Sequence, residues 1–145
     1  MFESAAIRAG LPLHHVGMVV TSIADALPFF RDTLGLEPGE IRDVPEQSVR
    51  ILFLRAGPTQ VELVEPVGDS GVARYLAERG KASLHHVCFA VDDLAATLRR
   101  LEKAGVELID HQPRPGAEGD VAFIHPTASG GVLVELIDPA SPRRR

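Results

Sequence analysis

Two histidines and two glutamates in this chain stand where they could bind a divalent metal ion. The segment LHHVGMVV at 13–20 returns as LHHVCFAV at 84–91, and QVELVEP at 60–66 returns as LVELIDP at 133–139. A histidine from the first segment and a glutamate from the second therefore occur twice, in the same order. These side chains are His15, Glu62, His86 and Glu135.

Side chains alternate between the two faces of a strand, and this alternation indicates where the four side chains point. His15 shares its face with Gly17, and His86 shares its face with Cys88 and Ala90, whereas bulkier neighbours lie on the opposite face. We expect the bulky face to pack under a helix and the smaller side chains to line a concave site. Each glutamate lies between apolar neighbours, where burying a carboxylate is costly unless it is paired or bound to a metal.

Two imidazoles and two carboxylates suit one divalent ion per chain. Co²⁺, Mn²⁺, Ni²⁺, Zn²⁺ and Mg²⁺ are the ions that these donor types leave open. Four protein ligands around an octahedral ion leave two positions that could chelate a substrate through two oxygens. Taken singly, each histidine could be structural and each glutamate could lie on a solvated face. The duplication of the whole set favours metal binding.

The repeat also predicts the elements that must carry these side chains. Each half reads as a strand, a helix and three further strands, with Ser22 capping the first helix and Asp92 and Asp93 preceding the second. Pro28 lies inside the first helix, where it should kink the helix or reduce its stability. A third helix is expected at 70–80, between the halves. The strands expected beyond the first two helices are 49–56, 60–65, 106–109, 121–125 and 132–137.

The expected fold class is therefore α+β. Two duplicated βαβββ modules would form curved mixed sheets around a metal-binding cleft. The expected organisation is a flexible N-terminal segment at 1–12, one domain at 13–139 and a basic tail at 140–145. Within that domain the modules are 13–66 and 84–139, and the helical linker is 67–83.

The composition excludes several function classes. A length of 145 residues suits one domain with its own core. Fifteen basic against twenty acidic residues give a net charge of −5, which argues against a nucleic-acid partner. The single cysteine, Cys88, excludes an internal disulfide and suits a reducing compartment. No apolar run reaches the roughly 20 residues of a membrane span. With no export signal visible, we expect a cytoplasmic protein.

Other residues are less informative about chemistry. Cys88 is expected to be a small core thiol. His111 and His125 lie at a loop and a strand end, which favours surface or structural roles. Arg114, in the segment HQPRPGAEGD, could either meet an anionic substrate or remain solvated. The glycines near it do not form a phosphate-binding fingerprint.

The ordered motifs resemble the vicinal oxygen chelate superfamily of glyoxalases, bleomycin resistance proteins and dioxygenases, and within it the methylmalonyl-CoA epimerases. The resemblance spans 13–139 and rests on HHVGMVV, ALPFFRDTLGLE, VPEQSVRILFL, TQVELVEP, LHHVCFAVDDL, RPGAEGDVAFIHP and GGVLVELID. It implies a metal-dependent enzyme, often a homodimer, that interconverts (2R)- and (2S)-methylmalonyl-CoA. By matching motif, it implies the same four metal ligands that the strand alternation selects.

Such a reaction removes a proton alpha to a thioester and returns it from the opposite face. A metal can stabilise the enolate, and two bases can exchange the protons. The resemblance implies that Glu135 is one base. Some relatives have the other base where this chain has Ile51, and the nearest carboxylate here is Glu46, our candidate for that role. A water or another polar group is the alternative. Thr127 stands where relatives often have a lysine, which leaves the residues that bind CoA unidentified.

Three other activities are compatible with parts of the pattern. A glyoxalase-type enzyme would use the same four ligands on a thiol hemithioacetal, although the PEQ and RPGAEG segments resemble epimerases better. An extradiol dioxygenase would use two histidines and one carboxylate. A metal-free binding module of the same fold would be expected to have a broken ligand set, and here the set is intact.

Overall fold

The computed structural model describes residues 10–141, which divide into two compact units. We call His15–His85 the first unit, and residues 10–14 with 86–141 the second unit. Most of the expected flexible N-terminal segment, 1–12, and of the expected basic tail, 140–145, lies outside the described residues. Within the described range, no helix has both the length and the hydropathy needed to span a membrane.

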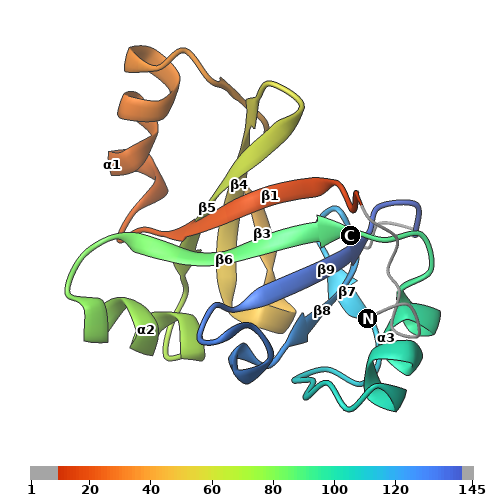
Figure 1. Cartoon of the computed structure of the whole chain (residues 1–145). Helices are drawn as coiled ribbons and strands as arrows, with labels where there is room; N and C mark the ends of the chain where they lie inside the picture. The colour runs from red at the N-terminus through yellow and green to blue at the C-terminus, as the bar shows by residue number, and fades with distance from the viewer. Residues whose placement is uncertain (1–9, 142–145) are drawn as a thin grey trace. The chain divides into compact units, whose positions relative to one another are not determined.

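The first unit contains a mixed sheet and two α-helices (Figure 1). Strand β1 runs parallel to β5, β5 runs antiparallel to β4, and the short strands β2 and β3 both pair with β4. Its elements are β1 (Leu13–Val19), α1 (Ile23–Pro28), a π-helical turn η2 (Phe29–Thr33), β2 (Glu37–Pro38), β3 (Arg42–Val44), a 3₁₀ turn η3 (Pro45–Gln47), β4 (Val49–Ala56), β5 (Thr59–Pro66) and α2 (Gly71–Arg79).

The second unit repeats this arrangement. Strand β6 runs parallel to β9, β9 runs antiparallel to β8, and β8 runs antiparallel to β7. Its elements are β6 (Ser83–Ala90), α3 (Leu94–Lys103), β7 (Arg114–Gly116), β8 (Gly119–Ile124), a 3₁₀ turn η4 (Pro126–Ser129) and β9 (Val134–Asp138). The first residues of β1 and of β6 are counted with the opposite unit.

The predicted α+β fold with two βαβββ modules and mixed sheets is confirmed. Strands β3, β4 and β5 of the first unit correspond to β7, β8 and β9 of the second. One expected strand differs: 106–109 makes only a single bridge, between Leu108 and Ile124. The helix predicted at 70–80 is present as α2, capped by Ser70 and closed by Gly80 in the left-handed conformation.

One sheet face in each unit carries the hydrophobic core. In the first unit, Ile23 of α1 packs with buried residues of alternate strand positions, among them Leu52, Leu54 and Leu63. In the second unit, the buried face of α3 packs against Ala122 and Leu136, together with the residues Val91, Leu94, Leu98, Leu101 and Leu108. Because side chains alternate along a strand, the residues between these core positions point to the opposite face of each sheet.

Pro28 changes the helix that contains it. The regular α-helix ends at Pro28, and the next five residues, Phe29–Thr33, form a π-helical turn. Proline cannot donate the backbone hydrogen bond that an α-helix needs. We attribute the change from α-helix to π-helical turn to this missing donor. The expected kink is therefore observed as a transition from α to π geometry.

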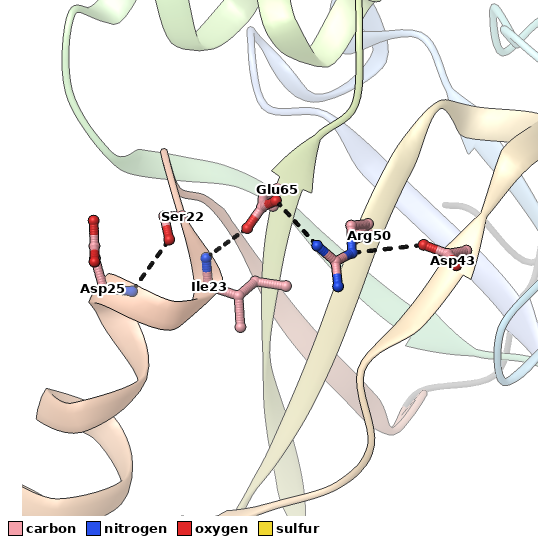
Figure 2. Close-up of polar contacts among 6 residues, drawn as sticks. All are labelled: Ser22, Ile23, Asp25, Asp43, Arg50 and Glu65. Carbon is pink, nitrogen blue, oxygen red and sulfur yellow. Dashed lines mark hydrogen bonds and ion pairs between the residues drawn. The ribbon is translucent and has the colours of Figure 1, made fainter.

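A series of polar contacts, which we call the ladder, connects helix α1 to the sheet through Glu65, Arg50 and Asp43 (Figure 2). Glu65 Oε1 accepts a hydrogen bond of 2.8 Å from Ile23 N, and Glu65 Oε2 lies 3.7 Å from Arg50 Nη1. Arg50 Nε lies 3.6 Å from Asp43 Oδ1, so the ladder crosses β5, β4 and β3. Ser22 Oγ accepts from Asp25 N at 3.2 Å and caps the same helix. The start of α1 is thereby fixed to the strand that also carries Glu62.

The hairpin between β7 and β8 depends on two glycines. Gly119 has φ +139°, and a Cβ on it would lie 2.3 Å from the Asp138 carbonyl oxygen. A Cβ on Gly116 would lie 2.7 Å from the Gly119 carbonyl oxygen. No other residue type fits this close approach of backbones. The glycines of RPGAEG therefore serve a tight hairpin, at the start of which stands Arg114.

Candidate active site

In the first unit, His15 and Glu62 lie side by side on the sheet face away from α1. Strands β1 and β5 are parallel here, with Gly17 opposite Glu62, and His15 Nε2 is 3.3 Å from Glu62 Oε1. The two residues are buried, with exposed fractions of 2% and 8%. Phe53, the partner of Glu62 on β4, meets the His15 ring edge-on with centroids 5.1 Å apart. A buried polar pair is thus packed against an aromatic ring.

In the second unit, His86 and Glu135 form the equivalent pair. Cys88 is opposite Glu135 between the parallel strands β6 and β9, and His86 Nε2 is 3.0 Å from Glu135 Oε1. The exposed fractions are 6% for His86 and 5% for Glu135. Phe123, the partner of Glu135 on β8, meets the His86 ring at a steep angle with centroids 6.0 Å apart. The two units therefore present the same three residue types in the same arrangement.

The alternation of faces that the sequence predicts agrees with this packing. Met18 and Val20 pack with the residues of α1, and Phe89 packs with the residues of α3. Cys88 lies on the other face, in a small buried cluster with Val121 and Ile137. It is a core thiol, as the sequence predicts.

The donor atoms of each pair are spaced as ligands of one metal ion would be. Neighbouring ligands about 2.1 Å from an ion and at right angles to each other lie about 3 Å apart. The pairs measure 3.3 Å and 3.0 Å between Nε2 and Oε1. A hydrogen bond from the imidazole to the carboxylate spans a similar distance, so each pair is also satisfied without an ion. Nitrogen and carboxylate donors of this kind suit a divalent ion of the transition series.

Glu46, the candidate for the second base, is placed differently. It lies on η3, the exposed 3₁₀ turn before β4, and not on a sheet face. Ile51 is buried on β4, opposite Val64, two residues from Phe53 and on the same face. Among the residues of β3 and β4 that share this face with Ile51, none is an acid.

The remaining histidines have local partners near the surface. His111 Nδ1 contacts Glu102 Oε2, and both side chains are more than half exposed. His125 Nδ1 accepts a 3.1 Å hydrogen bond from Thr127 N and caps the turn η4. Thr127 Oγ1 donates to Glu107 Oε1 at 3.1 Å. These contacts support the structural roles expected for both histidines.

The sequence does not predict the positions of two pairs of residues on these faces, although it singles out Arg114 as a residue that could meet an anionic substrate. Phe53 and Phe123 occupy equivalent positions beside His15 and His86. One step further out, Arg42 of β3 pairs with Ile51, and Arg114 of β7 pairs with Val121. The internal shift is not constant along the chain, so these matches become visible only through strand pairing. A search for repeats that permits short insertions could have found the phenylalanines.

The chain is similar to proteins of one superfamily over most of its length. The family model described as Glyoxalase/Bleomycin resistance protein/Dioxygenase superfamily matches residues 14–123. The chain is 43% identical to an uncharacterized protein of Bacillus subtilis, with 88% of this chain and 91% of that protein covered. It is also 37% identical to the mitochondrial methylmalonyl-CoA epimerase of Mus musculus, with 86% of this chain and 71% of that protein covered.

Solved structures lead to the same family. A methylmalonyl-CoA epimerase in complex with methylmalonyl-CoA and NH₄⁺ matches with a TM-score of 0.83 and 31% identity, covering 91% of this chain and 99% of that one. The chain belongs to the methylmalonyl-CoA epimerase family. As a member of this family it is an enzyme of the racemase and epimerase class. The buried His–Glu pair of each unit is the candidate site of this epimerase.

Proposed function

We propose that this enzyme interconverts the (2R) and (2S) forms of methylmalonyl-CoA in a reaction that depends on one divalent metal ion. The similarity to a methylmalonyl-CoA epimerase in complex with methylmalonyl-CoA supports this assignment most directly. The duplicated, buried His–Glu pairs support it independently, because they supply the donor types that the superfamily chemistry requires.

The ion would be held by one such pair from each unit. The ligands in this proposal are His15, Glu62, His86 and Glu135. When bound, a divalent ion supplies Lewis-acid chemistry: it stabilises the negative charge that develops on the thioester oxygen as the alpha proton leaves. Co²⁺ is our first choice of metal, with Mn²⁺, Ni²⁺, Zn²⁺ and Mg²⁺ as alternatives.

Glu135 carries the proton on one side of the substrate in this proposal. Its Oε1 lies 3.0 Å from His86 Nε2, so the imidazole orients the carboxylate. The neighbouring Phe123 and Cys88 are buried and limit the access of water to it. A carboxylate in such a setting can take the alpha proton and return it. Glu46, or a water in its place, is the proposed carrier on the opposite side.

The resemblance also carries three proposals on the setting of the enzyme. We propose that the substrate is bound as an acyl-CoA, that the chain forms a homodimer and that it acts in the cytoplasm. The first follows from the complex with methylmalonyl-CoA. The other two are predictions from the sequence and from the family.

Incubation of the pure (2S) substrate in D₂O tests the proposal. Deuterium should enter the alpha position, and the (2R) form should appear, only when both enzyme and metal are present. Metal-independent inversion would contradict the role of the ion. Failure to invert with every divalent ion, together with turnover of a thiol hemithioacetal, would assign the enzyme to the glyoxalase class instead.

A further inference from the structure

Arg114 stands on the same sheet face as the His86–Glu135 pair. It pairs with Val121 on β8, and Val121 pairs with Ile137 on β9. Directly paired residues share a face, so Arg114 lies one row of side chains from Phe123 on the neighbouring strand β8, and Glu135 lies on the strand beyond, β9. Rows on one face are about 7 Å apart along a strand. An arginine side chain can span that distance.

Phe123 connects the arginine to the histidine. The Arg114 Cζ lies 5.3 Å from the centre of the Phe123 ring, and the other neighbour of that ring is His86, 6.0 Å away between centroids. A guanidinium stacked on an aromatic ring is held in a defined plane by cation–π attraction. The contact therefore places a positive charge next to the aromatic ring that also meets His86.

The loop before β7 holds the other side of the guanidinium. Asp110 Oδ2 lies 3.5 Å from Arg114 Nε and also accepts a 2.8 Å hydrogen bond from Phe123 N. The Nε atom is buried and makes no hydrogen bond among residues 10–141. In the same range, no hydrogen bond or ion pair involves the two Nη groups. Asp110 therefore contacts the Nε edge of the guanidinium, and the Phe123 ring contacts its flat face. Among residues 10–141, the Nη edge has no acceptor.

The hairpin makes this placement rigid. Gly116 and Gly119 permit a turn that no larger residue fits, and the arginine precedes this turn by two positions. The side chain is 38% exposed, so a ligand on the sheet face can still reach it. A pre-ordered charge binds an anion with less loss of side-chain entropy than a free one.

We propose that Arg114 binds the free carboxylate of the acyl group and thereby selects carboxylated acyl-CoA substrates over neutral ones. This inference rests on the proposed function, because it places the acyl group beside Glu135. Arginine presents paired N–H donors that match the geometry of a carboxylate. The phosphates of CoA are the alternative anions, but the pantetheine arm separates them from the thioester, whereas Arg114 contacts Phe123, the direct strand partner of Glu135.

Arg42 occupies the corresponding place in the first unit. It pairs with Ile51 as Arg114 pairs with Val121. The two arginines extend the internal repeat beyond the histidine, glutamate and phenylalanine. We assign the carboxylate to Arg114 because it shares a sheet face with Glu135, the proposed base.

Calorimetric binding to the metal-loaded enzyme tests the inference without requiring turnover. The ligands are methylmalonyl-CoA, propionyl-CoA, which lacks the carboxylate, and CoA itself. Arg114→Gln should weaken methylmalonyl-CoA binding about 10–100-fold, the usual cost of losing a hydrogen bond to a charged group. Propionyl-CoA and CoA should bind as they do to the parent enzyme. Arg114→Lys should recover part of the loss, because it keeps the charge without the planar fork.

Arg99→Gln, on the exposed side of α3, is the matched control for the lost charge. Equal weakening of all three ligands by Arg114→Gln would assign the arginine to a CoA phosphate and overturn the proposal. Unchanged binding of methylmalonyl-CoA by Arg114→Gln would also overturn the proposal. So would a parent enzyme that binds propionyl-CoA as tightly as methylmalonyl-CoA. Thermal unfolding of each variant separates these outcomes from misfolding. Failure of the proposed function is recognised separately, because the parent enzyme then fails to invert methylmalonyl-CoA.

Discussion

Each buried imidazole in this enzyme has a carboxylate beside it. A carboxylate that is 5% exposed, as Glu135 is, would be costly to bury without a partner. Its partner here is an imidazole nitrogen at 3.0 Å. A bound metal cation would offset the free-energy cost of burying this carboxylate more strongly than an imidazole does. The chemistry of single residues therefore predicts which substitutions weaken metal binding.

His86→Ala should lower the affinity for divalent metal while leaving the protein folded. Loss of a residue that only orients a ligand already costs about 10–100-fold in affinity, so loss of a ligand should cost at least as much. Titration with Co²⁺ and elemental analysis measure the effect. His111→Ala, which removes an exposed imidazole from the same unit, should bind metal normally. Normal affinity in His86→Ala would remove His86 from the ligand set.

Glu46 offers a sharper test of the proton path. If it carries the second proton, Glu46→Gln should slow inversion by about 10²–10⁴-fold, the range for a positioned general base. Metal affinity should not change. Deuterium exchange and inversion must be measured separately, because a one-base enzyme can exchange one epimer without inverting it. Glu40→Gln, another exposed acid of the first unit, is the control. If Glu46→Gln inverts the substrate at the parental rate, Glu46 is not the second base. Its exposed position on η3 would agree with that result.

At the scale of elements, the first residue of α1, Ile23, donates its backbone N–H to a residue of strand β5, Glu65. Glu65→Ala removes the acceptor of Ile23 N and the central carboxylate of the ladder to Arg50. We expect a loss of about 1–2 kcal/mol in the free energy of unfolding. Urea denaturation measures it, with Glu78→Ala on α2 as the control. An unchanged unfolding midpoint would show that α1 is held by its apolar contacts alone.

The strands and helices differ in how well the sequence predicts them. The segment 49–56 is long and apolar, and the strand β4 has those bounds. For the π-helical turn after Pro28 the sequence predicts only a kink, because it shows the missing backbone donor and not the geometry that follows. Strands β3 and β7 have three residues each, too few for a recognisable alternation, and their pairing depends on the neighbouring strands. Consequently His15 and Glu62 were found from their motifs, whereas the positions of Arg42 and Arg114 required the sheet register.

At the scale of the whole molecule, the proposed ion links residues that belong to different units. A ligand that binds only the folded protein stabilises it, by about 2.7 kcal/mol when present at 100 times its dissociation constant. Saturating metal should therefore raise the unfolding temperature, and a chelator should reverse the rise. His15→Ala and His86→Ala lie in separate units, and each should reduce the rise measured at the same metal concentration. A rise that is unchanged by either substitution would show that the substituted histidine is not a ligand.

The short strands β2, β3 and β7 also affect how this protein behaves at high concentration. A long, flat outer strand offers a row of unpaired backbone groups onto which another chain can add, and aggregation often starts there. Strands β2, β3 and β7, at the end of each sheet away from β1 and β6, have two or three residues, and β2 and β7 contain Pro38 and Pro115, which have no N–H to donate. Strand addition from a second molecule would therefore end after very few hydrogen bonds. Because these strands are so short, they are hard to predict from the sequence. Their short length also protects this edge of each sheet against β-pairing with another molecule.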